Sequence, residues 1–377
     1  MNCALRVLPL VVVLAFSLPA KAQSYSEIIL ADQPFAYWRL DESGGGPAEN
    51  LGTNVAESAQ YSGDSQLEFG VAGLADPDNA AVRFNGLDED QFFDDGVAVG
   101  GRVDIANSNL SNSGGPYPEK TIELWFNADS VDPESHQVLY EQGGSTRGMA
   151  IYIFDGELVL GAHNSNDDDG GISTPWPGGT DADRELAFVK TNIEANTTYH
   201  TALVMDGSTD GTTGTITGYL NGEAFGVVEG IGQIFAHTDA IAIGGLRAQT
   251  LFEDGGLGND VDTELRFFQG VIDEVALYNK ALSAGRIGIH FGNPVDPDVN
   301  ADGAVDLADF AILAANFNSP GTFEQGDINL DGLVSMNDFV AWRQAFSAAP
   351  AAVPEPSASL LALFGVFGLV LRRRRSA

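Results

Sequence analysis

The sequence contains a single cysteine, Cys3, which lies within residues 1–22. Residues 1–22 combine Arg6, an apolar run over residues 8–18 and a small-residue cleavage site ending at Ala22. This arrangement is typical of a secretory signal peptide, and the apolar run is shorter than the roughly 20 residues that span a bilayer. The sequence therefore predicts an exported mature chain without cysteine, held together by neither disulfide bonds nor thiolate–metal sites.

Basic residues are also scarce, with 18 Lys and Arg against 53 Asp and Glu. So acidic a surface repels nucleic acid and anionic lipid and attracts divalent cations. The hydrophobic content of 44% is nevertheless ordinary, which indicates a folded acidic protein and not a disordered one. We expect no nucleic-acid partner.

Recognisable catalytic motifs are missing as well. The nucleophile elbow Gly-x-Ser-x-Gly and the strand pattern Glu-x-Asp-x-x-Glu of related glycosidases do not occur. The five histidines show neither metal-ligand spacing nor an obvious partner acid: His136, His163, His200, His237 and His290. No catalytic residue is assigned, and activity is disfavoured, although carboxylates distant in sequence could still meet in the fold.

Residues 25–292 instead contain many short runs in which apolar and polar residues alternate, separated by Gly, Asn and Asp. Residues 121–126 show this alternation, and Asp155-Gly156 and Asn221-Gly222 each stand between two such runs. Asp-Gly and Asn-Gly are strong hairpin signals because both turn residues need positive φ. The pattern predicts one all-β domain over residues 23–292, a two-sheet sandwich of the jelly-roll kind.

Three motifs give this domain a family resemblance. Residues 36–42 read AYWRLDE, residues 121–126 read TIELWF, and residues 270–283 read GVIDEVALYNKALS. In this order they resemble bacterial LamG-like, concanavalin A-type domains. The resemblance implies a carbohydrate- or protein-binding sandwich, often with calcium at one rim. We interpret the tryptophans of the first two motifs and Tyr278 as core residues. Asp273 and Glu274 are interpreted as structural, since neighbouring strand residues face opposite ways.

A loop between two of the expected strands carries the candidate ligand contacts of the sandwich. Trp176 lies between two prolines in the Gly-rich, acidic segment 164–183, where its indole could stack on a sugar ring or could pin the loop to the sheet. Asp167, Asp168 and Asp169 could bind a further calcium ion, or could form a solvated loop tip. The acidic segment 254–262 is ambiguous in the same way.

Two segments after the sandwich match the twelve-residue calcium loop of EF-hands. Oxygen ligands are expected at loop positions 1, 3, 5, 9 and 12, with a backbone carbonyl at 7 and glycine at 6. The first set is Asp298, Asn300, Asp302, Ala304, Asp306 and Asp309. The second set is Asp327, Asn329, Asp331, Leu333, Ser335 and Asp338. The sequence therefore predicts two calcium sites.

Each loop runs into a short amphipathic segment, and neither has an entering helix. This pairing resembles the dockerin type I module over residues 293–347, which implies a small helical, calcium-folded unit that binds a cohesin-like partner. The Ser-Thr pair that many cellulosomal dockerins use at positions 10 and 11 is replaced by Leu307-Ala308 and Met336-Asn337. This departure leaves open a different partner or a purely structural calcium unit.

The C-terminal residues 348–377 form a three-part tail. It contains Pro354, Glu355 and Pro356, an apolar run over residues 358–371, and the basic cluster Arg372, Arg373, Arg374 and Arg375. The tail resembles the PEP-CTERM sorting signal, which implies a short transmembrane helix, an exosortase-type partner and transfer to the outer surface or matrix of a Gram-negative-type bacterium. A permanent single-span anchor is the alternative.

Three functions fit these observations. The first is a cell-surface or matrix binding protein whose sandwich engages a polysaccharide or a surface protein. The second is a structural matrix protein without a glycan ligand. The third is a secreted glycoside hydrolase that degrades polysaccharide. Fold alone does not distinguish them.

Overall fold

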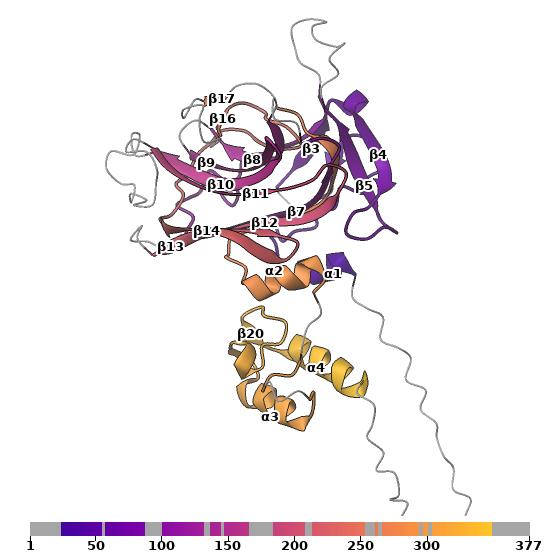
Figure 1. The fold of residues 1–377 in the computed structure, drawn as a ribbon, viewed down its shortest axis with the longest axis vertical. Coiled ribbons are helices and arrows are strands. Elements are labelled where there is room, and N and C mark those ends of the chain that lie inside the picture. Colours follow the sequence, from indigo (N-terminus) through magenta and orange to yellow (C-terminus); the bar gives the residue numbers. More distant parts are fainter. Residues whose placement is uncertain are drawn as a thin grey trace, which may run out of the picture. The chain divides into compact units, whose positions relative to one another are not determined.

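The computed structural model (Figure 1) describes the following residues: 24–54, 57–86, 100–131, 136–144, 147–165, 184–207, 213–252, 261–262, 266–293, 297–300 and 304–348. They fall into two compact units, divided between Pro294 and Val295. The first unit is a β-sandwich, and the second contains two helices and one pair of short strands.

Two antiparallel sheets form the sandwich (Figure 1). Sheet A has the order β14 (Glu223–Ile231), β13 (Gly214–Leu220), β12 (Thr198–Asp206), β7 (Glu119–Ala128), β18 (Gln269–Tyr278), β5 (Ala80–Asn85) and β4 (Leu67–Ala72), with β1 (Ala36–Trp38) also paired to β18. Sheet B has the order β11 (Arg184–Asn192), β10 (Glu157–Ser165), β9 (Arg147–Phe154), β8 (Gln137–Gly143), β15 (Ile241–Ile243), β6 (Arg102–Ile105), β3 (Ala59–Ser62) and β2 (Pro47–Ala48). The short helix η1 (Asp64–Gln66) precedes β4, and β16 (Thr250–Leu251) pairs with β17 (Val261–Asp262).

The core lies between the two sheets and is built from alternate residues of each strand. Ile122, Leu124 and Phe126 of β7 face it from sheet A, and Leu158 and Leu160 of β10 face it from sheet B. All five side chains are buried, as the period-two pattern of these strands requires. The predicted all-β sandwich is confirmed.

Both predicted hairpins are present. Asp155 (φ 49°) and Gly156 (φ 76°) connect β9 to β10, and Asn221 (φ 51°) and Gly222 (φ 81°) connect β13 to β14. Positive φ at both central residues is the geometry of the type I′ turn, which matches the twist of the paired strands.

The prediction that the three motif aromatics are buried core residues is confirmed, and they lie in two different layers. Trp38 lies between the sheets. Trp125 and Tyr278 are buried on the opposite, outer face of sheet A, where Trp125 packs against Tyr25 and Phe291 with ring centroids 5.9 and 5.8 Å away. Side chains on the outer face of a sheet are buried only where a further layer covers them.

Two helices provide that layer. α1 (Tyr25–Ala31) and α2 (Ala284–Phe291) place Ile29 and Ile287 against the outer face of sheet A (Figure 1). α1 begins with a capping box between Ser24 and Glu27. The start of the predicted mature chain and the end of the sandwich are thus packed together.

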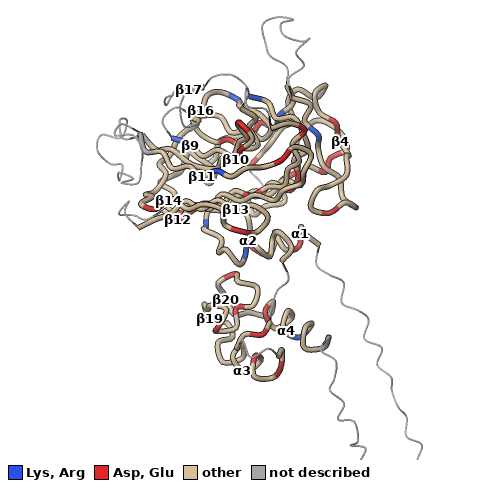
Figure 2. Tube along the Cα trace, in the orientation of Figure 1, with Lys and Arg blue, Asp and Glu red and all other residues tan. Residues whose placement is uncertain are grey.

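The second unit contains α3 (Leu307–Asn316), η3 (Phe323–Gln325) and α4 (Met336–Ala348), and β19 (Ser319–Pro320) pairs with β20 (Leu333–Val334). Its small core contains Val299, Leu313, Ile328, Val334 and Trp342. Acidic side chains are distributed over both units (Figure 2), so the negative charge is not confined to the calcium-type loops. Within the described ranges no helix is both long and apolar enough to cross a membrane.

Candidate functional site

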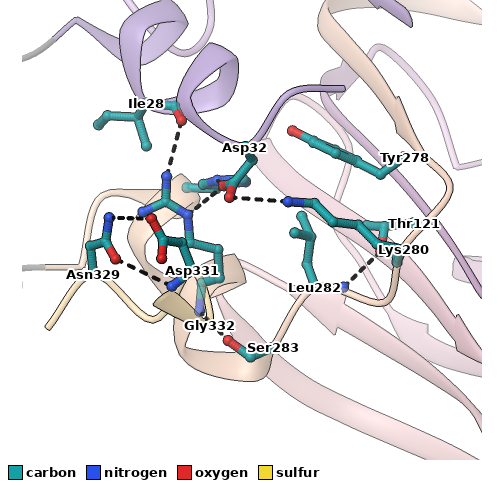
Figure 3. A network of polar contacts seen from close by, with 12 residues as sticks. Ile28, Asp32, Thr121, Tyr278, Lys280, Leu282, Ser283, Asn329, Asp331 and Gly332 are labelled. Atoms are coloured by element: carbon teal, nitrogen blue, oxygen red, sulfur yellow. Dashed lines mark hydrogen bonds and ion pairs between the residues drawn. The ribbon is translucent and has the colours of Figure 1, made fainter. Parts of the chain in front are cut away.

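A network of buried charged side chains lies on the outer face of sheet A, beneath α1 and α2; Figure 3 shows the part of it around Asp32. Nδ1 of His290 lies 3.0 Å from both carboxylate oxygens of Glu123, and its Nε2 lies 2.7 Å from Oδ2 of Asp32. Arg286 also contacts Asp32 and donates to the carbonyl of Ile28 at 3.0 Å. The network joins both helices to the central strand β7.

The opposite charges of this network stabilise each other's ionised forms. Burial favours the neutral forms, but His290 and His200 lower the pKa of Glu123, and the two carboxylates raise the pKa of His290. The hydroxyl of Tyr278 donates to Glu123 at 2.6 Å, and Nε2 of His200 lies 3.2 Å from the same carboxylate. An imidazolium between two carboxylates can donate from both ring nitrogens, which is the arrangement found here.

This network corrects the sequence interpretation of the histidines. His290 has two partner acids and His200 has one, although no spacing in the sequence indicated them. Asp32, Glu123 and His290 come from three distant segments that only the fold brings together. Their side chains are at most 1% exposed, so no substrate reaches them and the network fixes helices to the sheet.

A second pair of buried carboxylates lies in β18, where the structure again differs from the sequence interpretation. Glu274 has φ +56°, and the pairing of β18 with β7 skips from Asp273 to Ala276, so the strand contains a bulge. Both carboxylates therefore reach the segment between β4 and β5. Asp273 accepts from the backbone nitrogen of Leu74 at 2.7 Å, and Glu274 accepts from Nδ2 of Asn79 at 3.3 Å.

These carboxylates should make the sandwich less stable as the pH rises. Burial, followed by repulsion from Glu274, raises the pKa of Asp273 to about 8, and burial raises the pKa of Glu274 to about 6. Because these folded-state values exceed the ordinary carboxyl pKa of about 4, the stabilisation is complete below pH 4 and lost as the pH rises through 6 and 8. Asp32 and Glu123, whose pKa values are lowered, lose their contribution only in acid.

We therefore expect the free energy of unfolding to fall by roughly 5 kcal/mol between pH 5 and pH 8. Chemical denaturation of the mature chain at several pH values measures this slope. Asp273→Asn should flatten it most, since that residue carries the larger shift. A slope that is equally steep in the variant would contradict the assignment.

The outer face of sheet B carries an aromatic cluster. His136 stacks between Phe154 and Phe252, with ring centroids 4.2 and 4.3 Å away, and Tyr152 lies 4.6 Å from Phe252. Glu141 of β8 lies on the same face, opposite Ala150, and burial raises its pKa well above the usual range. This part of the face is apolar, with one buried carboxyl group.

Beside the cluster the same face becomes polar and partly exposed. Asp104 of β6 is 22% exposed, and its Oδ1 lies 2.6 Å from Nε of Arg102 and 3.7 Å from Nε of Arg247. Ala242 separates Asp104 from Glu141 across the strands. The rings of His136, Tyr152 and Phe252 are buried, so the accessible part of this face is the partly exposed carboxylate with its two guanidinium groups, which offers donors and acceptors to the hydroxyl groups of a ligand.

In the second unit, each calcium-type loop ends in a helix N-cap, and the two caps are of the same kind. Asp306 caps α3, and Asp309 accepts from the backbone nitrogen of Asp306 at 2.7 Å. Ser335 occupies the equivalent place before α4, and its backbone nitrogen donates to Asp338 at 2.7 Å. Loop positions 9 and 12 therefore form capping boxes, a role that does not itself require a cation.

The second loop also folds its remaining acidic side chains inward. Asp327 accepts from the backbone nitrogens of Asp331 and Gly332 at 3.1 and 2.8 Å, and Asn329 accepts from that of Asp331 at 3.3 Å. Burial and the charges of Asp331 and Asp338 raise the pKa of Asp327 to about 6. Crowded, partly buried carboxylates of this kind fit a divalent cation, which relieves their repulsion.

Within the described residues, no three His, Cys, Asp or Glu side chains lie close enough together to hold a metal ion by themselves. The predicted second set includes three aspartates, Asp327, Asp331 and Asp338, and in this structure they do not form such a group. The first loop is described at Asp298, Asn300, Ala304, Asp306 and Asp309, whereas Asp302 lies outside the described residues.

The sequence pattern of the concanavalin A-like lectin/glucanases superfamily matches residues 95–288. These residues include most strands of both sheets and the outer face of sheet B. The chain belongs to the concanavalin A-like lectin/glucanases superfamily.

The chain is similar to several solved structures at low identity. The binding domain of a Paraclostridial mosquitocidal protein is 13% identical (TM-score 0.45), and the alignment covers 70% of this chain and 52% of that one. Domain 4 of an extracellular arabinanase from Geobacillus stearothermophilus, solved with arabinotriose, is 14% identical (TM-score 0.43), with 68% and 98% covered. The binding domain of botulinum neurotoxin serotype D is 10% identical (TM-score 0.44), with 71% and 53% covered. The chain thus spans about half of the length of the first of these, and no curated protein matches the sequence.

The PEP-CTERM protein-sorting motif matches residues 352–375, as the sequence predicted. It indicates export of this concanavalin A-like protein through a sorting system to the cell envelope or surface of a Gram-negative-type bacterium. The sorting-motif residues themselves lie outside the described residues, as do Trp176, Asp167, Asp168 and Asp169. The segment that contains Trp176 connects β10 to β11, whose ends pair at Ser165 and Arg184.

Proposed function

We propose that this protein is an exported cell-surface or matrix lectin-like protein whose sandwich binds a polysaccharide on the outer face of sheet B. The observation that carries the proposal is the contrast between the two outer faces. On sheet A, α1 and α2 and the Glu123 network cover the strands at the centre. On sheet B, Asp104 and its two arginines are partly exposed beside the aromatic cluster.

The chemistry of this face suits a sugar. A sugar ring offers hydroxyl groups that exchange hydrogen bonds with carboxylate and guanidinium groups, and an apolar C–H face that packs on aromatic rings. Trp176, in the segment that leaves the same sheet after β10, would add a stacking surface, and Asp167, Asp168 and Asp169 beside it would hold a further calcium ion.

We expect the isolated sandwich, residues 23–292, to bind a defined polysaccharide on a glycan array. Asp104→Asn should weaken binding by about 10- to 100-fold, because hydrogen bonds to a charged group contribute roughly 1.5–3 kcal/mol. Trp176→Ala should weaken it by a similar factor through lost stacking. Asp129→Asn is the matched control, since Asp129 is also 22% exposed and paired with an arginine, Arg83, but belongs to sheet A.

The outcomes separate the three functions. Binding that disappears with a chelator would assign calcium to the acidic loops of the sandwich. A blank array with and without calcium would overturn the lectin-like function and favour a structural matrix protein. Shortening of the bound polysaccharide would establish a glycoside hydrolase instead.

For the second unit we propose calcium binding at both loops and docking to a cohesin-like partner. The crowded carboxylates of the second loop support the calcium ion. Leu307 and Met336, at position 10 of the two loops, are 64% and 58% exposed, so the partner would present an apolar surface to them. An exosortase-type enzyme would then process the C-terminal tail and release the protein to the outer surface or matrix.

A further inference from the structure

Lys120 is a buried lysine at the inner side of sheet A. It precedes Thr121 in β7, pairs with Met205 across the sheet and is 2% exposed. Its Nζ lies 3.0 Å from Oδ1 of Asn279 and 3.1 Å from the carbonyl of Leu110. Asn279 follows Tyr278, which pairs with Thr121, so the two side chains are next to each other in the β7–β18 ladder.

The surroundings of the amine are largely apolar. Nζ lies 4.1 Å from the ring centre of Tyr117 and 5.3 Å from that of Phe35. Burial lowers the pKa of Lys120 to about 7, although the charge of Glu57 acts in the opposite direction. A large share of the side chain is therefore a neutral amine at neutral pH, the form that acts as a nucleophile.

The amide of Asn279 is held in one orientation. Its Nδ2 donates to the carbonyl of Leu110 at 3.0 Å while its Oδ1 faces Nζ of Lys120. Since Cγ is bonded to Oδ1 at about 1.2 Å, Nζ lies within roughly 4.2 Å of the amide carbon, so a small rotation reaches attack distance. Asn279 is itself exposed at the rim of the sandwich, which gives a leaving molecule a way out.

A buried carboxyl group, that of Glu57, lies in the same region as Lys120 and Asn279. Glu57 is fully buried, and its Oε1 has no hydrogen-bond partner among the described residues. Its Oε2 accepts from Nδ2 of Asn54 at 3.2 Å. Glu57 is also the charged group whose field acts on Lys120, so it lies in the same buried region. A buried carboxyl with a free oxygen can carry a proton between reacting groups.

We propose that Lys120 and Asn279 form an intramolecular isopeptide bond, assisted by Glu57. Nζ of Lys120 attacks Cγ of Asn279, the Nζ–Cγ bond forms and the Cγ–Nδ2 bond breaks. One proton passes from the amine through Glu57 to Nδ2, which leaves as ammonia. No electron is transferred, and no co-reactant is needed. The bond would join β7 to the end of β18 and would serve an exported chain without disulfide bonds.

The intact mass of the purified mature protein tests this directly. We expect it to be lower than the sequence mass by one ammonia, and a protease digest to contain one branched peptide that joins the Lys120 and Asn279 segments. An unmodified mass would overturn the proposal and leave Lys120 as a buried, hydrogen-bonded lysine. This result does not depend on whether the protein binds a glycan.

Three variants distinguish the roles. Asn279→Ala and Glu57→Gln should restore the full sequence mass, the first by removing the amide and the second by removing the proton carrier. Lys190→Arg, at a lysine that is 54% exposed and paired with Glu157, should keep the ammonia loss. A branched peptide that persists in Glu57→Gln would remove Glu57 from the mechanism, and one that persists in Asn279→Ala would exclude Asn279 as the acceptor.

Discussion

Glu123→Ala is expected to lower the free energy of unfolding of the sandwich by about 3–5 kcal/mol, because removing one partner of a buried ion pair leaves the other charge uncompensated. The variant takes both contacts of Nδ1 away from His290, the acceptor away from the Tyr278 hydroxyl and the partner away from His200. All of these groups are buried in the folded protein. Chemical denaturation near pH 6 measures the loss.

Glu157→Ala is the matched control. Glu157 also forms a salt bridge, 2.6 Å from Nζ of Lys190, but those side chains are 28% and 54% exposed. Exposed pairs contribute at most about 1 kcal/mol, so the control should change the stability little. Comparable losses in the two variants would show that the Glu123 network does not hold α1 and α2 to the sheet.

The sequence allowed the sandwich to be predicted because its signals are local. Alternation in residues 121–126 and the Asp155-Gly156 and Asn221-Gly222 turns depend on a few neighbouring residues, and each is present in the structure as predicted. The signal also had a limit. Period-two alternation separates the two faces of a strand but does not say whether the outer face is covered, so it did not predict that Trp125 and Tyr278 are buried beneath a further layer.

The charged sites could not be predicted in the same way, because their members meet only through the fold. Asp32, Glu123 and His290 come from α1, β7 and α2, and nothing in their spacing connects them. One signal was nevertheless available: Glu123 occupies a strand position between apolar residues, where a carboxylate needs a buried partner. Likewise the bulge at Glu274 depends on a positive φ, which the sequence motif does not predict.

Chelation of calcium is expected to unfold the second unit and to leave the sandwich folded. Each loop contains at least three aspartates in the sequence, and in the second loop burial, together with the charges of Asp331 and Asp338, raises the pKa of Asp327. A cation at a thousandfold excess over its dissociation constant stabilises the folded state by about 4 kcal/mol per site. The core of this unit rests on a few residues around Leu313 and Trp342, so a loss of that size should unfold it. Hydrogen exchange in α3 and α4 of the mature chain, with calcium and then with chelator, measures the effect separately from the sandwich.

The helix caps make the choice of variants important. Asp338 accepts from the backbone nitrogens of Ser335 and Asn329, so Asp338→Ala would destabilise α4 even without calcium. Asp331→Asn is the more specific variant, because it removes a charge from the loop and leaves the cap intact. It should lower the affinity for calcium and the protection against hydrogen exchange that calcium gives to α4. Glu324→Gln, at an exposed acid of the same unit outside the loops, should change neither. If the exchange in α3 and α4 is the same with calcium and with chelator, the loops are capped turns that fold without metal, and the resemblance to a calcium-folded module fails.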